Sequence, residues 1–171
     1  TEKSAPWYAQ YNKMTTINIS GITSIGSYAF YGCTKFSSLT MSTITTINNN
    51  AFEGCTGFTS LTIPESVTSL GDSAFNGCTE LSSITWNKVQ TIGTNTFQGC
   101  TKLTKLELPD TVTTIGNYAF DGCVLVDTLT FNKVKTIGEY AFNNCDKITK
   151  VISGNDFYIE RLFIYNNCPH F

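Results

Sequence analysis

The sequence has little charge, no close pair of cysteines and no long apolar run. Charged residues make up 14% of its 171 residues, below the ~25% of an average soluble protein, and the formal net charge is −2. This balance argues against a nucleic-acid or membrane-surface binder, which needs a basic patch. No segment approaches the ~20 apolar residues of a membrane-spanning helix. The apolar share of 41% still predicts a folded core.

The sequence motifs of common enzymes are also missing. The chain contains no glycine-rich phosphate loop, no H-E-x-x-H and no G-x-S-x-G. The single histidine, His170, lies next to Cys168 near the end of the chain, and such close neighbours rarely form a working Cys–His dyad. Carboxylates are scattered and do not form a calcium loop. We therefore expect no catalytic residue, no metal site and no cofactor.

The cysteines mark an internal repeat. Their gaps alternate between 22 and 23 residues, whereas disulfide frameworks are uneven and zinc sites need close pairs. A phenylalanine or tyrosine stands three positions before each cysteine, and apolar residues recur at fixed offsets around it. This period predicts a solenoid of about seven coils. The cysteines are Cys33, Cys55, Cys78, Cys100, Cys123, Cys145 and Cys168.

Each unit predicts a strand, a turn, a second short strand and a bend. Apolar residues six and eight positions after the cysteine alternate with polar ones, as in a strand with one buried face. Residues 67–70 illustrate the second β-segment, and the Ala-Phe-x-Gly-Cys segment is expected to form a helical turn or a tight bend. The glycine before that segment suits a positive φ or close packing. Stacked units would form a parallel β-ladder on one face, with short turns or helical bends on the other.

Two longer units give the chain a second period of 45 residues. They carry proline after the strand, in Ile63-Pro64 and Leu108-Pro109. Ten positions after the cysteine, the charge alternates in sign from coil to coil. In stacked coils these residues would form a column, which is either a ladder of exposed ion pairs or a charged binding stripe. Its charged members are Glu65, Lys88, Asp110 and Lys133.

The unit resembles the BspA-like leucine-rich repeat family. Residues 103–109 read L-T-K-L-E-L-P and residues 115–123 read I-G-N-Y-A-F-D-G-C. The resemblance implies a leucine-rich-repeat solenoid, secreted or at the cell surface, from a bacterium or a protist. Such proteins resemble adhesins that bind host matrix proteins, host receptors or other microbes. The alternatives are a passive spacer or stalk within a larger surface protein, and the targeting module of a larger hydrolase.

The two ends depart from the repeat. Residues 1–13 include Trp7 and other aromatics, similar to the lead-in of bacterial relatives, and we predict an N-terminal aromatic cap. The repeat array is expected to occupy residues 14–171. Its last unit, 149–171, is irregular, with Glu160 in the isoleucine slot. This unit is either a divergent cap or the truncated part of a longer array.

Two columns are candidate binding surfaces. Tyrosines five positions before the cysteine are typical of interfaces but could equally pack over the bend; they are Tyr28, Tyr118 and Tyr140. The other column is the outward face of the predicted strands, whose serines and threonines either bind a partner or simply favour strands. The candidate residues on this face are Thr40, Thr62, Thr85, Lys105, Glu107, Thr130 and Lys150.

The cysteines are expected to be free. Equivalent residues of stacked coils have parallel Cβ vectors, which is poor disulfide geometry, and their number is odd. We predict a buried ladder of thiols that act as small apolar side chains.

Overall fold

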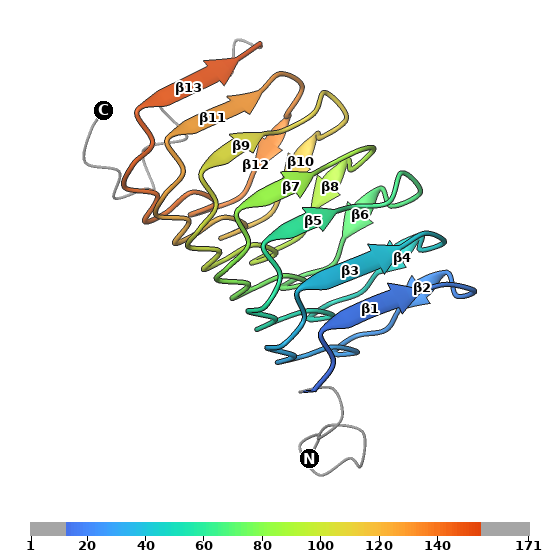
Figure 1. The fold of residues 1–171 in the computed structure, drawn as a ribbon. Helices are drawn as coiled ribbons and strands as arrows, with labels where there is room; N and C mark the ends of the chain where they lie inside the picture. The colour runs from blue at the N-terminus through green and yellow to red at the C-terminus, as the bar shows by residue number, and fades with distance from the viewer. Residues whose placement is uncertain (1–12, 155–171) are drawn as a thin grey trace.

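The structure is a computed structural model that describes residues 13–154, and these residues wind into a parallel β-solenoid (Figure 1). One longer strand per coil lies along the same side of the molecule, and we call these the main strands. Their burial alternates, as in β1, because leucine or isoleucine points inward between polar residues. The main strands are β1 (Thr16–Ile19), β3 (Ser38–Met41), β5 (Ser60–Thr62), β7 (Ser83–Thr85), β9 (Lys105–Glu107), β11 (Thr128–Phe131) and β13 (Lys150–Ser153).

A second sheet runs unbroken along the solenoid. Its six strands have two residues each and pair in parallel in the order β12-β10-β8-β6-β4-β2. In β10, for example, Ile115 is buried and pairs with Ile92 of the preceding coil. These strands are β2 (Ser24–Ile25), β4 (Thr46–Ile47), β6 (Ser69–Leu70), β8 (Thr91–Ile92), β10 (Thr114–Ile115) and β12 (Thr136–Ile137).

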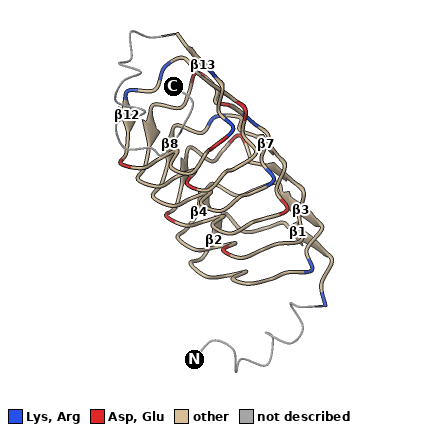
Figure 2. Cartoon of the chain, turned by 90° about the vertical axis from the view of Figure 1, so that its left-hand side faces the viewer, with Lys and Arg blue, Asp and Glu red and all other residues tan. Residues whose placement is uncertain are grey.

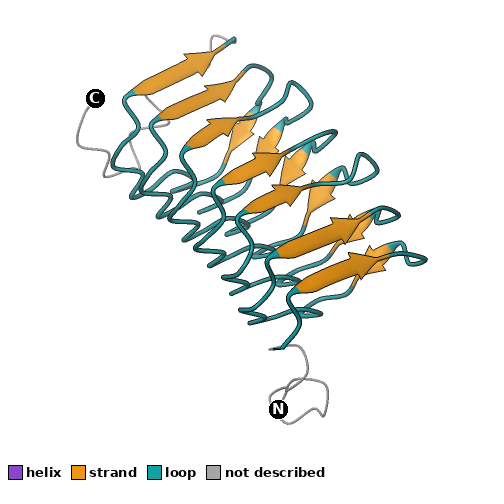
Figure 3. Ribbon diagram, in the orientation of Figure 1, coloured by secondary structure: helices purple, strands orange, loops and turns teal. Residues whose placement is uncertain are grey.

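The Ala-Phe-x-Gly-Cys segments form the third side of each coil. Between residues 13 and 154 they contain no helix, so the tight bend forms and the helical turn does not (Figure 3). Each bend is hydrogen-bonded to the next coil, since Phe52 N–H donates to the Ala74 carbonyl at 2.8 Å and Phe97 N–H to the Ala119 carbonyl at 2.8 Å. Three ladders of backbone hydrogen bonds therefore join the coils: main strands, second sheet and bends.

Phenylalanine rings form a continuous stack inside the bends. Each ring lies parallel to the ring of the next coil, with centroids 5.2–5.5 Å apart and interplanar angles of 4–8°. A parallel pair at this separation is offset, which is a favourable aromatic geometry. Trp86 adds an edge-on contact to Phe97, with centroids 5.3 Å apart. The stack is made of Phe30, Phe52, Phe75, Phe97, Phe120 and Phe142.

The six described cysteines are free and buried, as predicted. They are more than apolar side chains, because five of the six thiols donate hydrogen bonds to the preceding coil. Cys78 Sγ lies 3.3 Å from the Phe52 carbonyl oxygen, and Cys145 Sγ lies 3.2 Å from that of Phe120. The thiol ladder thus helps to join the coils beside the phenylalanine stack.

Burial of these thiols predicts a loss of stability at alkaline pH. Burial raises the pKa of Cys100 to about 12, and it raises the pKa of Cys123 well above its usual value. In the unfolded chain these thiols ionise near pH 9, so the folded state holds more protons between pH 9 and 12. The buried protonated thiols contribute fully to the free energy of unfolding below pH 9, and this contribution is lost as pH rises toward 12. The urea midpoint should therefore fall between pH 8 and pH 11, and fall less in a Cys100→Ala variant. An equal fall in both proteins would contradict the assignment.

Candidate functional site

The structure places all seven strand-face candidates on one surface, the outward face of the main strands. Thr40, Thr62 and Thr85 lie on β3, β5 and β7, and all three are exposed. The register places Lys105 beside Thr128, which in turn lies beside Lys150. Glu107 pairs with Thr130 in the neighbouring row. The predicted residues thus share one face.

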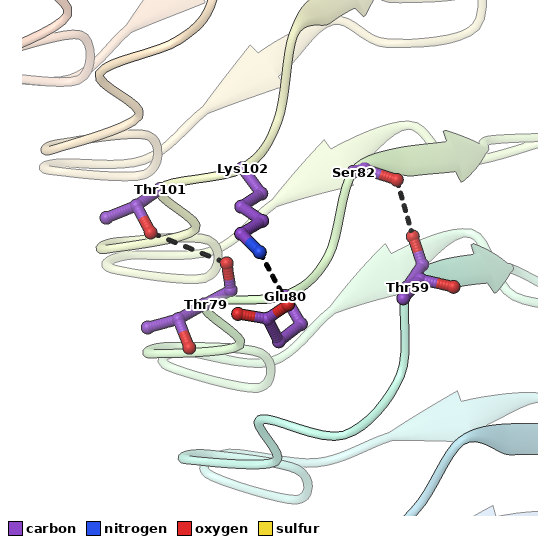
Figure 4. Close-up of polar contacts among 6 residues, drawn as sticks. All are labelled: Thr59, Thr79, Glu80, Ser82, Thr101 and Lys102. Carbon is purple, nitrogen blue, oxygen red and sulfur yellow. Dashed lines mark hydrogen bonds and ion pairs between the residues drawn. The ribbon is translucent and has the colours of Figure 1, made fainter.

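The hydroxyl groups of this face are free to meet a partner. At the corner just before the main strands, serine and threonine hydroxyls donate to carbonyls of the preceding coil, as Ser82 Oγ does to the Thr59 oxygen at 2.9 Å (Figure 4). The hydroxyls of Thr40, Thr62 and Thr85 make no such bond with any described residue. Corner hydroxyls therefore stabilise the stack, whereas outward hydroxyls remain available.

The outward face changes its chemistry along the solenoid. From β1 to β7 it carries only serine, threonine and asparagine, and its charged residues begin on β9. Lys105, Glu107 and Lys150 all lie in the C-terminal coils. Over residues 13–154 the acidic and basic positions are dispersed along the coils (Figure 2). The arrangement suits hydrogen bonding to a partner better than attraction of a strongly charged one.

The predicted ion-pair ladder forms only in part. Lys88 Nζ lies 3.1 Å from Glu65 Oε2, with both side chains mostly exposed. Asp110 instead accepts a hydrogen bond from Asn132 Nδ2 at 2.9 Å. Among the described residues the other ion pair is one the sequence did not predict, Lys102–Glu80, with Nζ and Oε2 2.7 Å apart (Figure 4). Exposed pairs of this kind contribute only ~0–1 kcal/mol, so the column contributes little to stability.

The tyrosine column lies on the bend side, away from the outward face of the main strands. Tyr28, Tyr118 and Tyr140 all have positive φ, of 60°, 54° and 56°. A bulky residue rarely adopts this conformation, and the cost is ~1–2 kcal/mol. Tyr118 and Tyr140 stack on each other with centroids 5.1 Å apart, so their ring contacts support the bend. Tyr28 is 47% exposed. The two candidate columns cannot form one site.

A polar ladder on the bends was missed by the sequence reasoning. In four successive coils, the side chain two positions before the cysteine is hydrogen-bonded to its equivalent in the neighbouring coil. Gln98 Nε2 donates to Asp121 Oδ2 at 2.8 Å, and Asn143 Nδ2 donates to Asp121 Oδ1 at 3.0 Å. The signal was the variable position x of Ala-Phe-x-Gly-Cys, which is an acidic or amide residue in five of the bends. The ladder consists of Asn76, Gln98, Asp121 and Asn143.

The described part of the chain holds no cluster of three or more histidine, cysteine, aspartate or glutamate side chains that could bind a metal ion. It also has no helix of the length and hydropathy needed to cross a membrane. His170, Cys168 and most of the last unit lie outside the described residues, as does the proposed cap except for Lys13. The division into a cap at 1–13 and an array at 14–171 therefore stays a prediction.

Coil length, parallel strands and a leucine- and phenylalanine-rich core define a leucine-rich-repeat solenoid. A family model described as a BspA type leucine rich repeat region matches residues 5–100 and 85–170, with 6 copies. The chain belongs to this BspA type leucine-rich repeat family, as the motifs predicted.

Solved structures of bacterial leucine-rich repeat proteins have the same fold. One from Bacteroides ovatus is 23% identical, with a TM-score of 0.53 over 84% of this chain. The leucine-rich repeat protein of T. pallidum is 19% identical, with a TM-score of 0.56 over 87% of this chain and 79% of its own. The chain spans 56% of the length of the Bacteroides ovatus protein. No curated protein sequence matches it.

Proposed function

We propose that the chain is a non-catalytic protein-interaction module that acts at the cell surface or after secretion, as an adhesin or in host recognition. Its membership in the BspA type family supports a role in protein interaction. The observation that carries the proposal is the row of exposed polar side chains along the main strands that make no hydrogen bond within the described chain.

The outward face of the main strands is the proposed contact surface. Its uncharged part offers hydroxyl donors and acceptors, and Lys105, Glu107 and Lys150 add charges of both signs. Within each group of paired main strands these groups repeat at ~4.8 Å, so a partner meets a regular array there. Such a surface recognises a partner mainly through directional hydrogen bonds, with the charged residues setting its orientation.

Binding to purified extracellular-matrix proteins and to intact host and bacterial cells tests this proposal. A double variant Thr62→Arg/Thr85→Arg should weaken saturable binding about tenfold or more, because two bulky cations would disrupt the centre of the surface. The matched control Thr46→Arg/Thr136→Arg changes two exposed threonines of the second sheet and should bind like the parent. Equal losses in both variants would contradict the proposed face, and no saturable binding to any probe would favour a spacer or stalk.

A further inference from the structure

The main strands do not form one continuous sheet. They divide into three blocks, β1-β3, β5-β7 and β9-β11-β13, whereas the second sheet is unbroken. Figure 1 shows wider spaces between β3 and β5 and between β7 and β9. We call these two boundaries the seams. Leu39 of β3 and Ile84 of β7, which border the seams, are only partly buried, whereas Leu61 and Leu106 across the seams are buried.

Proline stands at the same place beside each seam. Pro64 follows Ile63 after β5, and Pro109 follows Leu108 after β9. The Ile63 N–H donates to the Thr85 carbonyl of the following coil, and the Leu108 N–H donates to that of Thr130. Because N–H groups along a strand alternate between its edges, a residue at position 64 or 109 would point its N–H at the preceding coil, across the seam. Proline has no such N–H.

Two of the four described coils without proline at this position make a hydrogen bond there to the preceding coil. Gly154, the equivalent of Pro64 in the coil of β13, donates its N–H to the Phe131 carbonyl at 3.3 Å. Asn87 uses its side chain, with Nδ2 lying 2.6 Å from the Ile63 oxygen. In both cases the main strands of the two coils are paired. The seam follows proline because its ring occupies the donor's place and keeps the strands apart.

We infer that the outward face consists of three separate β-blocks that open at two proline-defined seams, while the second sheet and the bends hold the coils together. The face can therefore change its curvature without unwinding the solenoid. This inference concerns the free protein and does not depend on the proposed function, so it stands even if no partner is found.

Amide hydrogen exchange of the free 171-residue chain, followed by NMR, tests the inference. The amides of Ser60 and Thr62 point into the first seam and should exchange about tenfold faster than those of Ser83 and Thr85, which point at a paired strand. Pro64→Ala restores the N–H and should slow amide exchange at Ser60 and Thr62. The exchange rates of Lys105 and Glu107 at the second seam should not change.

The converse variant is Ser42→Pro, which places proline at the equivalent position after β3. It should speed exchange at Ser38 and Thr40 by opening a seam inside the β1-β3 block. The amide of Ile92 in the second sheet serves as the reference for global stability in each protein. Equal protection of all main-strand amides, or unchanged exchange at Ser60 in Pro64→Ala after this correction, would overturn the inference.

Discussion

Replacing Gly116 by alanine is expected to destabilise the protein by about 3 kcal/mol, at the upper end of overpacking effects. A Cβ atom built on Gly116 would lie 2.6 Å from the carbonyl carbon of Gly93 and 2.7 Å from the Thr94 nitrogen. Both atoms belong to the backbone of the preceding coil. Because Gly116 N–H also donates to the Ile92 carbonyl at 2.8 Å, the two coils cannot separate without breaking the second sheet. Chemical denaturation of the variant measures the loss.

The matched control is Gly26→Ala at the same position of the first coil. A Cβ there meets nothing within 4 Å, so the change should alter stability by no more than about 0.5 kcal/mol. Asn48 occupies this position in the second coil and shows that a side chain is tolerated near the end of the solenoid. Similar losses for Gly26→Ala and Gly116→Ala would contradict close coil packing as the reason for glycine.

Truncating the centre of the phenylalanine stack should cost more, about 3–5 kcal/mol for Phe97→Ala. Phe97 is completely buried, and its ring stacks on Phe75 and Phe120 at 5.4 and 5.5 Å. The substitution leaves a cavity and removes one of the two edge-on partners of Trp86. Because each coil contacts only its neighbours, loss of the Phe97 ring should weaken the coupling between the two halves of the solenoid. Thermal unfolding should then become broader as well as shift to lower temperature.

Phe30→Ala provides the comparison within the same stack. Phe30 is only half-buried, so its truncation should cost less than half as much as that of Phe97. The two proteins can be compared by urea denaturation under identical conditions. A Phe97→Ala variant that loses under about 1 kcal/mol would show that the stack contributes little to stability.

The repeat phase made the fold predictable from the sequence. Cysteine, phenylalanine and leucine recur at fixed offsets, and the same offsets appear as strand register, as in Leu129 beside Val151. The placement of Thr62 and Lys105 on the outward face follows from strand alternation alone. These features depend on the period of the pattern and on no single side chain.

Other features depend on individual atoms and could not be predicted from the pattern. Tyr118 adopts a positive φ against its own preference, because the bend requires that conformation in every coil. The expected charge ladder fails at Asp110, where a neighbouring amide satisfies the carboxylate. The seams follow from proline, which has no N–H to donate. The period of 45 residues predicted where proline stands but did not predict that the main strands separate there. The identity of a partner is decided by surface side chains, which the repeat leaves variable.

Equivalent residues of successive coils lie side by side in the second sheet and in each group of paired main strands of residues 13–154. The most direct test of this arrangement is a set of backbone NMR contacts (nuclear Overhauser effects) in the 171-residue chain. The structure predicts contacts between residues 22 or 23 positions apart, such as Leu129 with Val151 and Ile92 with Ile115. Contacts at other separations along the strands, or none between these pairs, would contradict the solenoid and with it the proposed binding face.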